Sequence, residues 1–200
     1  HFPQILDSHL NLKGMNVTIP YKEQIIPFLD SLDEAAKEIG AVNTIQITKN
    51  RQLKGYNRDV LGFEKSLQKL LKEHHKKALV LGTGGASKAI VYALKRMGIS
   101  STIVSRKPKQ DNHVAYQSIH QSLIEENTII VNCTPLGTQP DIEKSPQIPY
   151  QFITKHHLLY DLIYNPEETL FLQKGKKQGA NIKNGLEMLQ VQAEEAWKIW

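Results

Sequence analysis

The stretch KALVLGTGGASKAIVYALKRMGISSTIVS, Lys77 to Ser105, decides the fold of this chain. It opens with an apolar run at 77–82, of the kind that a parallel strand buried on both faces requires. A glycine-rich turn follows, then the spacing of a helix at 88–98 and a second strand at 101–105. Strand, helix and strand in this order predict one βαβ unit.

The glycine-rich turn GTGGAS, at 82–87, has the composition of a phosphate cradle. Gly82 permits a tight turn, Gly84 lets the backbone approach a pyrophosphate, and the following helix offers free N–H groups. Ser87 stands at the third fingerprint position, where Gly or Ala is usual. A GxGG pattern alone is a weak signal, but its place between a strand and a helix predicts a dinucleotide site.

The second strand ends in Ser105, Arg106 and Lys107. Proteins that bind NAD usually carry an Asp or Glu near this position, which accepts hydrogen bonds from the ribose hydroxyls. A guanidinium and an ammonium suit a 2′-phosphate instead, because Arg binds it as a fork and Lys adds a point charge. We therefore predict NADP(H) as the cofactor in preference to NAD; the alternative is a solvated basic turn.

The rest of the chain continues the alternation of strands and helices. The C-terminal part predicts strands at 127–132 and 158–163 and helices at 168–179 and 185–200. The N-terminal part predicts an extended segment at 12–20, a helix at 27–40, a strand at 41–48 with a partner strand after it, and a helix at 63–75. This pattern favours an open α/β sheet.

The N-terminal stretch GMNVTIPYK, at 14–22, predicts a strand that Pro20 stops just before Lys22. If a nicotinamide cofactor binds, reduction of a carbonyl needs a proton delivered to its oxygen, and a lysine at a strand end could supply it. Asp59 also follows a strand and precedes a helix, where by itself it could simply cap that helix.

Composition limits the class of protein. The 200 residues carry a formal charge of +5, from 25 Lys and Arg against 20 Asp and Glu, but the basic residues are scattered among acids. This argues against a nucleic-acid partner. The single cysteine excludes an internal disulfide and a thiolate metal cluster, and no apolar run has the length of a membrane span. We expect no metal and no membrane partner, and a cytoplasmic location.

Seven motifs together resemble the shikimate dehydrogenase family, in its order and at its approximate spacings over nearly the whole chain. They are GMNVTIPYK (14–22), GAVNT (40–44), GYNRDVLG (55–62), VLGTGGASKA (80–89), VNCTPLG (131–137), DLIYNP (161–166) and NGLEMLQVQA (184–193). The resemblance implies NADPH-dependent, reversible reduction of 3-dehydroshikimate to shikimate in chorismate and aromatic amino-acid biosynthesis. Lys22 matches the family's catalytic lysine and Asp59 its paired carboxylate.

The resemblance also implies binding residues, a small-molecule substrate and a monomer or homodimer. The substrate positions are Thr18, Asn43, Tyr164 and Gln192. The cofactor positions are Gly82, Gly84, Gly85 and Ala86 at the pyrophosphate, Ser105, Arg106 and Lys107 at the adenosine phosphate, and Thr134 and Gly185.

The expected fold class is α/β, with a Rossmann-like, doubly wound NADP-binding domain and a smaller α/β substrate-binding domain that the C-terminal helix completes. Residues 1–58 form the substrate domain, 59–184 the NADP domain, and 185–200 return to the substrate domain. The active site is expected in the cleft between them.

The chain departs from the family pattern at several positions. Arg58 replaces a threonine between Asn57 and Asp59, Ser105 replaces an asparagine, and Gln110 stands where a second arginine often helps to hold the 2′-phosphate. The family's N-terminal strand and its serine-containing motif are not found in these 200 residues. We expect the natural protein to be longer.

Two alternative functions remain. A quinate/shikimate dehydrogenase using NAD or NADP would share the motifs around Lys22 and Asp59, and a non-catalytic nucleotide-binding module would share the fold. Other reactive residue types are interpreted as structural. Cys133 is expected to be a packed residue, the histidine pairs at 74–75 and 156–157 to be poor metal sites, and Trp197 and Trp200 to be packing anchors.

Overall fold

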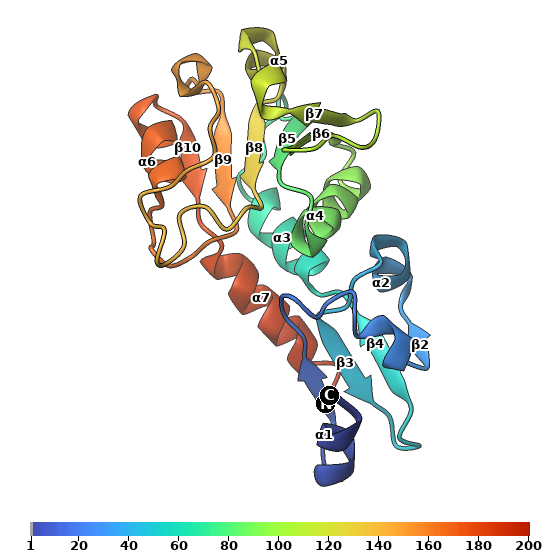
Figure 1. Ribbon diagram of the computed structural model, residues 1–200. Helices are drawn as coiled ribbons and strands as arrows, with labels where there is room; N and C mark the ends of the chain where they lie inside the picture. The colour runs from blue at the N-terminus through green and yellow to red at the C-terminus, as the bar shows by residue number, and fades with distance from the viewer. Residues whose placement is uncertain (1) are drawn as a thin grey trace.

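A computed structural model describes residues 2–200 and contains two sheets (Figure 1). The larger sheet is six-stranded and parallel throughout, in the order β10-β9-β8-β5-β6-β7. Its strands are β5 (Lys77–Leu81), β6 (Ser100–Ser105), β7 (His113–Ala115), β8 (Ile129–Asn132), β9 (Leu158–Asp161) and β10 (Asn181–Lys183). β5 lies between β6 and β8, so the strand that precedes the glycine-rich turn has further strands on both sides.

Helices cover both faces of the larger sheet. Successive residues of its strands point to opposite faces, and the residues on both faces are apolar, so each face packs against helices. Ala78 and Val80 of β5 pack with α3 (Asp59–Gln68) and α4 (Gly85–Arg96) in one cluster. Leu79 and Leu81 pack in a second cluster with α5 (Gln121–Glu126) and α6 (Leu170–Lys177). Short 3-10 turns, η2 (Tyr116–Ser118) and η3 (Tyr150–Phe152), belong to the connections. The predicted Rossmann-like arrangement is confirmed.

The smaller sheet has the order β1-β3-β4-β2 and is mixed. β1 (Gly14–Asn16), β3 (Thr44–Ile47) and β4 (Leu53–Tyr56) pair antiparallel, and β2 (Ser31–Leu32) pairs parallel to β4. α1 (Phe2–Ser8), η1 (Ile26–Phe28) and α2 (Glu34–Ile39) accompany it. Its core contains Val42, Ile45 and Leu53.

The last helix, α7 (Leu186–Trp197), runs from the larger sheet to the smaller one (Figure 1). At its far end the Trp200 indole N–H donates to the Ile45 carbonyl at 3.0 Å, and the Gln46 amide donates to the Ile199 carbonyl at 2.6 Å. The chain thus returns to the smaller sheet, as predicted. The boundaries at 58/59 and 184/185 stay a prediction.

Three predicted elements differ in extent. The helix expected at 27–40 is confined to 34–39, because Ser31 and Leu32 pair with β4 and the Asp33 carboxylate caps the helix at Ala36 N. The helix expected at 63–75 is instead Asp59–Gln68. The strand expected to reach Pro20 ends at Asn16, since a turn closed by Tyr21 N and the Thr18 carbonyl follows.

The prediction that both tryptophans are packing anchors is wrong for Trp197, whose surface is 75% exposed. Trp200 is 36% exposed and holds β3 through its hydrogen bond. Helical spacing cannot tell which side of a terminal helix faces solvent. None of the helices of residues 2–200 has the length and apolar character needed to cross a membrane.

Candidate active site

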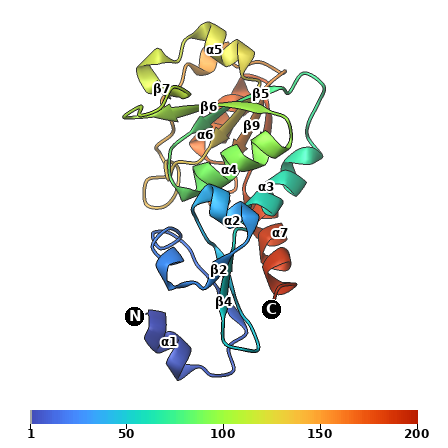
Figure 2. The same ribbon diagram turned by 90° about the vertical axis from the view of Figure 1, so that its right-hand side faces the viewer.

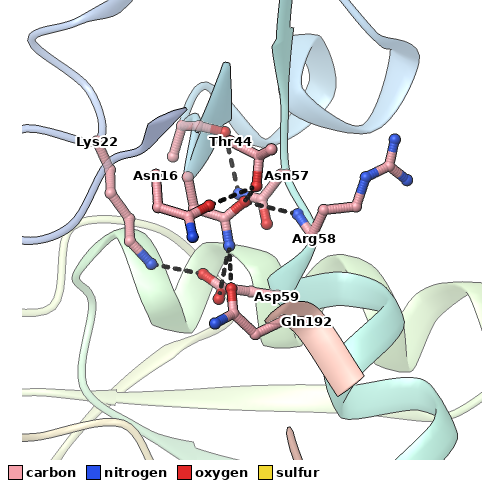
Figure 3. Close-up of polar contacts among 9 residues, drawn as sticks. Asn16, Lys22, Thr44, Asn57, Arg58, Asp59 and Gln192 are labelled. Carbon is pink, nitrogen blue, oxygen red and sulfur yellow. Dashed lines mark hydrogen bonds and ion pairs between the residues drawn. The ribbon is translucent and has the colours of Figure 1, made fainter. Parts of the chain in front are cut away.

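Lys22 and Asp59 form an ion pair between the two sheets. The Lys22 ammonium lies 2.6 Å from Asp59 Oδ2, and the two side chains are 13% and 10% exposed (Figure 3). The Lys22 carbonyl accepts from Val42 N at 2.8 Å, which fixes the residue beside the start of β3. Asp59 opens α3, where the helix dipole favours a negative charge. A shielded amine is thereby held against a carboxylate.

Asn43 holds the second oxygen of this carboxylate. Its amide nitrogen donates to Asp59 Oδ1 at 2.9 Å and to Gln192 Oε1 at 3.3 Å, and its oxygen accepts from Arg58 N at 2.7 Å. Asn43 is 3% exposed, so all these bonds are made out of water. Four of the six predicted catalytic and substrate residues therefore meet in one network: Lys22, Asn43, Asp59 and Gln192.

Gly62 lets Gln192 reach this network. A Cβ on Gly62 would lie 2.6 Å from the Met188 carbonyl oxygen and 3.2 Å from Gln192 Cβ, both on α7. The glycine therefore permits a close approach of α3 and α7. It is the last residue of the GYNRDVLG motif, but its partner helix is more than a hundred residues away in the chain.

Two further polar residues extend the network and were not singled out from the sequence. The Thr44 hydroxyl lies 3.1 Å from Asn43 Oδ1 and 3.3 Å from Asn16 Oδ1 (Figure 3). Thr44 is fully buried. Asn16 and Thr44 lie inside the motifs GMNVTIPYK and GAVNT, next to residues already chosen, and this position could have identified them from the sequence.

Arg58, which replaces the family's threonine, points away from the ion pair (Figure 3). Its guanidinium lies over the Tyr56 ring at 4.7 Å and 3.7 Å from the Asp33 carboxylate. Asp33 also caps α2. The substitution therefore adds a contact between the start of α3 and the start of α2 and leaves the Asp59 carboxylate unobstructed.

The remaining two predicted substrate residues lie outside this hydrogen-bond network. Thr18 is exposed in the turn before Lys22. Tyr164 is 47% exposed in the connection after β9. Both stay predictions.

The glycine-rich turn has the geometry that the sequence predicted. Gly82 has φ +113°, a region that side chains rarely adopt, and a Cβ there would lie 3.3 Å from the Cys133 carbonyl oxygen. Gly84 precedes α4 and has open space around its Cβ position. The Ser87 hydroxyl donates to the Gly82 carbonyl at 2.7 Å. This bond gives the unusual serine a structural role, and the turn leaves room for a pyrophosphate.

The glycine-rich turn lies against the segment that carries Lys22. A Cβ on Gly85 would be 4.0 Å from Lys22 Cβ, and Lys88 of α4 pairs with Glu23 at 2.7 Å. α2 faces α4 across this contact (Figure 2). The candidate cofactor turn and the candidate catalytic pair are thus neighbours. Gly85 and Ala86, both predicted cofactor residues, form the first turn of α4.

The predicted 2′-phosphate reader lies at the end of β6. The Ser105 hydroxyl accepts from Lys107 N at 3.1 Å, and the Arg106 and Lys107 side chains are exposed. A cavity of about 420 Å³ lies beside α4. It is lined, among others, by Glu38, Thr83, Lys88, Lys95, Gln110 and His113. The neutral Gln110 therefore borders a space that two lysines also face.

The last two cofactor candidates lie just beyond β8 and β10, the two strands that flank β9. Thr134 donates through its backbone N and its hydroxyl to Asn132 Oδ1, at 3.0 and 2.7 Å. A Cβ on Gly185 would lie 2.1 Å from the Leu162 carbonyl oxygen, so this position has no room for a side chain.

Cys133 packs against the core below the glycine-rich turn, as expected. Burial raises the pKa of its thiol well above the ordinary value, and the nearby Asp161 raises it further. The thiol is therefore protonated and a poor nucleophile. Within residues 2–200, no group of three or more His, Cys, Asp and Glu side chains is arranged to hold a metal ion.

Comparisons with known proteins find relatives over most of the chain. A family model described as "Shikimate dehydrogenase substrate binding domain" matches residues 1–45. The chain is 40% identical over 206 residues to the Shikimate dehydrogenase (NADP(+)) of Caldanaerobacter subterraneus subsp. tengcongensis, with 96% of the chain and 73% of that protein covered.

Solved structures are similar over the whole fold. Shikimate 5-dehydrogenase from Thermus thermophilus, in complex with NADP(H) and shikimate, has a TM-score of 0.86 and 30% identity, with 99% of this chain and 76% of that chain covered. Quinate dehydrogenase from Corynebacterium glutamicum, in complex with NAD, has a TM-score of 0.87 and 26% identity, with 100% and 77% covered.

Proposed function

The chain belongs to the shikimate dehydrogenase family, and from that membership we propose that it catalyses the NADPH-dependent, reversible reduction of 3-dehydroshikimate to shikimate. It would act as an oxidoreductase on a CH–OH group, in the biosynthesis of chorismate and aromatic amino acids. The observation that carries the proposal is the 2.6 Å pair of Lys22 and Asp59 next to the glycine-rich turn.

The residues of the turn fit NADP(H). The open space at Gly84 and the free N–H groups at the start of α4 suit a pyrophosphate. Arg106 and Lys107, both exposed, would hold the 2′-phosphate, with Thr134 and Gly185 further along the cofactor. A nicotinamide cofactor held there would supply the hydride chemistry for reduction of the carbonyl carbon.

The chain's own residues handle the proton. The Lys22 ammonium donates to the carbonyl oxygen as the hydride reaches carbon, and the neutral amine recovers a proton from solvent. Asp59 holds the ammonium in place and Asn43 holds Asp59. In the reverse direction the amine must be neutral to accept the hydroxyl proton, so we expect oxidation of shikimate to speed up towards alkaline pH. A flat rate from neutral to alkaline pH would contradict this role.

The substrate contacts follow from the resemblance to the family, and the network supports two of them. Asn43 and Gln192, with Thr18 from the neighbouring turn, would bind the hydroxyls, and Tyr164 would lie near the carboxylate. Residues 1–58 with 185–200 would form the substrate domain and 59–184 the NADP domain. We propose a cytoplasmic enzyme, a monomer or homodimer, with a small-molecule substrate and no nucleic-acid or membrane partner.

One second function has support. The likeness to quinate dehydrogenase bound to NAD, and the neutral Gln110 where an arginine is usual, favour a quinate/shikimate dehydrogenase that uses NAD or NADP. A non-catalytic nucleotide-binding module would explain the turn but not the buried pair.

The test is the absorbance of reduced cofactor when shikimate or quinate is added with NADP or NAD, beside Lys22→Ala and Asp59→Asn. NADP reduction with shikimate but hardly with quinate, lost in both variants while cofactor still binds, supports the proposal. Equal turnover of quinate favours the second function. Binding of NADP with turnover of neither substrate would leave the binding module.

A further inference from the structure

Asp161 is a fully buried carboxylate at the carboxyl end of β9 that the chemistry above does not use. It accepts three hydrogen bonds from three different segments. Asn132 Nδ2, at the end of β8, donates at 3.0 Å, Ile163 N donates at 3.0 Å, and the Thr169 hydroxyl donates at 2.6 Å. Thr169 is itself the N-cap of α6.

Two of the three donors lead on to candidate ligand residues. Asn132 turns its other amide atom, Oδ1, to the backbone N and hydroxyl of Thr134. Ile163 precedes Tyr164, and its carbonyl accepts from Gly185 N at 3.1 Å. One buried side chain thus joins the connection after β8, on the cofactor side, to the connection after β9, on the substrate side.

The negative charge of Asp161 does not stabilise the fold. Burial raises the pKa of Asp161 to about 6, against the lowering effect of its three hydrogen bonds. The titratable groups that face it are the Cys133 thiol and the Tyr150 phenol, and burial raises the pKa of both, so neither is charged near neutral pH. A raised carboxyl pKa means that ionisation opposes folding as the pH rises through 4 to 6.

The geometry nevertheless calls for an acceptor with two oxygens. All three partners point a hydrogen at Asp161, and an ionised carboxylate can accept from every one. An amide or a protonated acid has to place a hydrogen of its own against one of them. The Thr169 hydroxyl, which also accepts from Leu172 N, would have to turn its own hydrogen to another acceptor, and it is fully buried away from water.

We propose that Asp161 is a positioning residue that sets two parts of the site relative to each other: the connection at 132–136, which carries the cofactor candidate Thr134, and the residues after β9, which carry the substrate candidate Tyr164 and contact the cofactor candidate Gly185. The inference rests on the proposed function for the identity of the ligands. The proposal predicts that one substitution at Asp161 weakens the binding of both substrate and cofactor, because Asp161 holds both connections.

The test is Asp161→Asn in the intact protein, with the NADP Kd and the shikimate KM and kcat measured between pH 5 and 8. At pH 8 both the Kd and the KM should rise roughly tenfold, as expected for misplaced binding groups. In the unchanged protein the shikimate KM should rise as the pH falls below about 6, because the protonated acid resembles the amide. The variant should show no such rise.

Two controls separate positioning from stability. Asn127→Ala removes a buried amide that donates to the Leu123 carbonyl at 2.8 Å, before β8 and at the opposite end of that strand. It should lower the Tm without moving Kd or KM. Asn132→Ala cuts only the cofactor branch, and should raise the NADP Kd more than the shikimate KM; it also serves if Asp161→Asn does not fold.

The inference is overturned if Asp161→Asn lowers the Tm as Asn127→Ala does but leaves both constants within twofold of the unchanged protein. It is also overturned if Asn132→Ala leaves the NADP Kd unchanged. If the unchanged protein does not oxidise shikimate, the proposed function fails, and the NADP Kd of the two variants still decides the role of Asp161.

Discussion

The two ends of the larger sheet both carry buried polar side chains, but these side chains are engaged in different ways. At the amino ends of the strands, His75 and His157 close two loops: each Nδ1 accepts from a backbone N three residues earlier, at 3.0 Å. The Nε2 of His157 lies 3.0 Å from the Ile124 carbonyl and that of His75 3.3 Å from the His156 carbonyl. Both ring nitrogens of each histidine are therefore used within the protein.

At the carboxyl ends of the strands the polar groups are left partly available. The turn at Gly84 faces open space, and the Lys22 ammonium pairs with one carboxylate oxygen while keeping two other hydrogens. Ligands of open α/β sheets bind outside the carboxyl ends of the strands. The comparison teaches that the groups proposed to meet a ligand stay incompletely satisfied, whereas supporting groups, Asp161 and Asn132 at this end included, are bonded within the protein.

The largest effect is expected from a substitution in the proposed ligand site, at the carboxyl ends of the strands. Lys22→Ala removes the proposed proton acceptor of the oxidative direction, and kcat for shikimate oxidation should fall by about 100- to 10,000-fold. The Tm should fall modestly, because the buried Asp59 carboxylate loses its cationic partner but keeps the Asn43 amide, and the NADP Kd should change little. Steady-state kinetics and a thermal melt measure both. A large loss of Tm would place Lys22 among the supporting residues instead.

Two glycine substitutions are expected to have the next largest effects, one on packing and one on cofactor binding. Gly62→Ala puts a methyl 2.6 Å from the Met188 carbonyl, so it should cost about 1–3 kcal/mol of unfolding free energy and also lower kcat by moving Gln192. Gly84→Ala is its matched control, since a methyl there meets open space. It should leave stability nearly unchanged and weaken NADP binding. Urea unfolding and a cofactor titration distinguish the two; equal stabilities would contradict the close packing of α3 and α7.

At the supporting end, His157→Ala should act on stability alone. It removes an imidazole that is 2% exposed and leaves Thr154 N and the Ile124 carbonyl without their partner. The expected cost is about 1–3 kcal/mol in urea unfolding. The kcat of the folded fraction should stay within twofold. A selective loss of kcat at an unchanged midpoint would break the distinction between the two ends.

The sequence predicts the centre of the larger sheet because its signals there are local. The apolar run at 77–81 and the glycines at 82 and 84 each act within a few residues. The helix expected at 27–40 fails for the opposite reason. Its residues Ser31 and Leu32 are taken into pairing with β4, and Leu53 N donates to the Asp30 carboxylate at 2.6 Å. Tertiary pairing of this kind overrides helical spacing.

The candidate site divides in the same way. The phosphate turn can be deduced from the glycines and their neighbours, whereas the pairing of Lys22 with Asp59 comes from the family resemblance. Its 2.6 Å distance depends on the backbone bond between Val42 and Lys22 and on the first turn of α3. Asn16 and Thr44 join the network through side-chain bonds that no spacing rule predicts.

The finest test uses the opposite pH responses of the two ends. Burial lowers the pKa of His75, the hydrogen bond to the His156 carbonyl raises it, and the neighbouring His74, Lys72 and His157 side chains lower it further. A base with a lowered pKa takes up its proton more readily when unfolded, so its contribution is present above about pH 6.5 and is lost on acidification. Asp161, whose pKa is raised to about 6, has the opposite sign: stability increases as the pH falls from 6 to 4.

Replacing each group by asparagine should therefore change the pH profile of stability in opposite directions. His75→Asn keeps an acceptor for Lys72 N but cannot take up a proton, so stability should fall less steeply between pH 7 and 5. Asp161→Asn removes the compensating gain, so stability should fall more steeply over the same interval. Urea midpoints at each pH give the two slopes. Parallel slopes in both variants would mean that neither buried group titrates on folding, and that the two ends differ only in their hydrogen bonds.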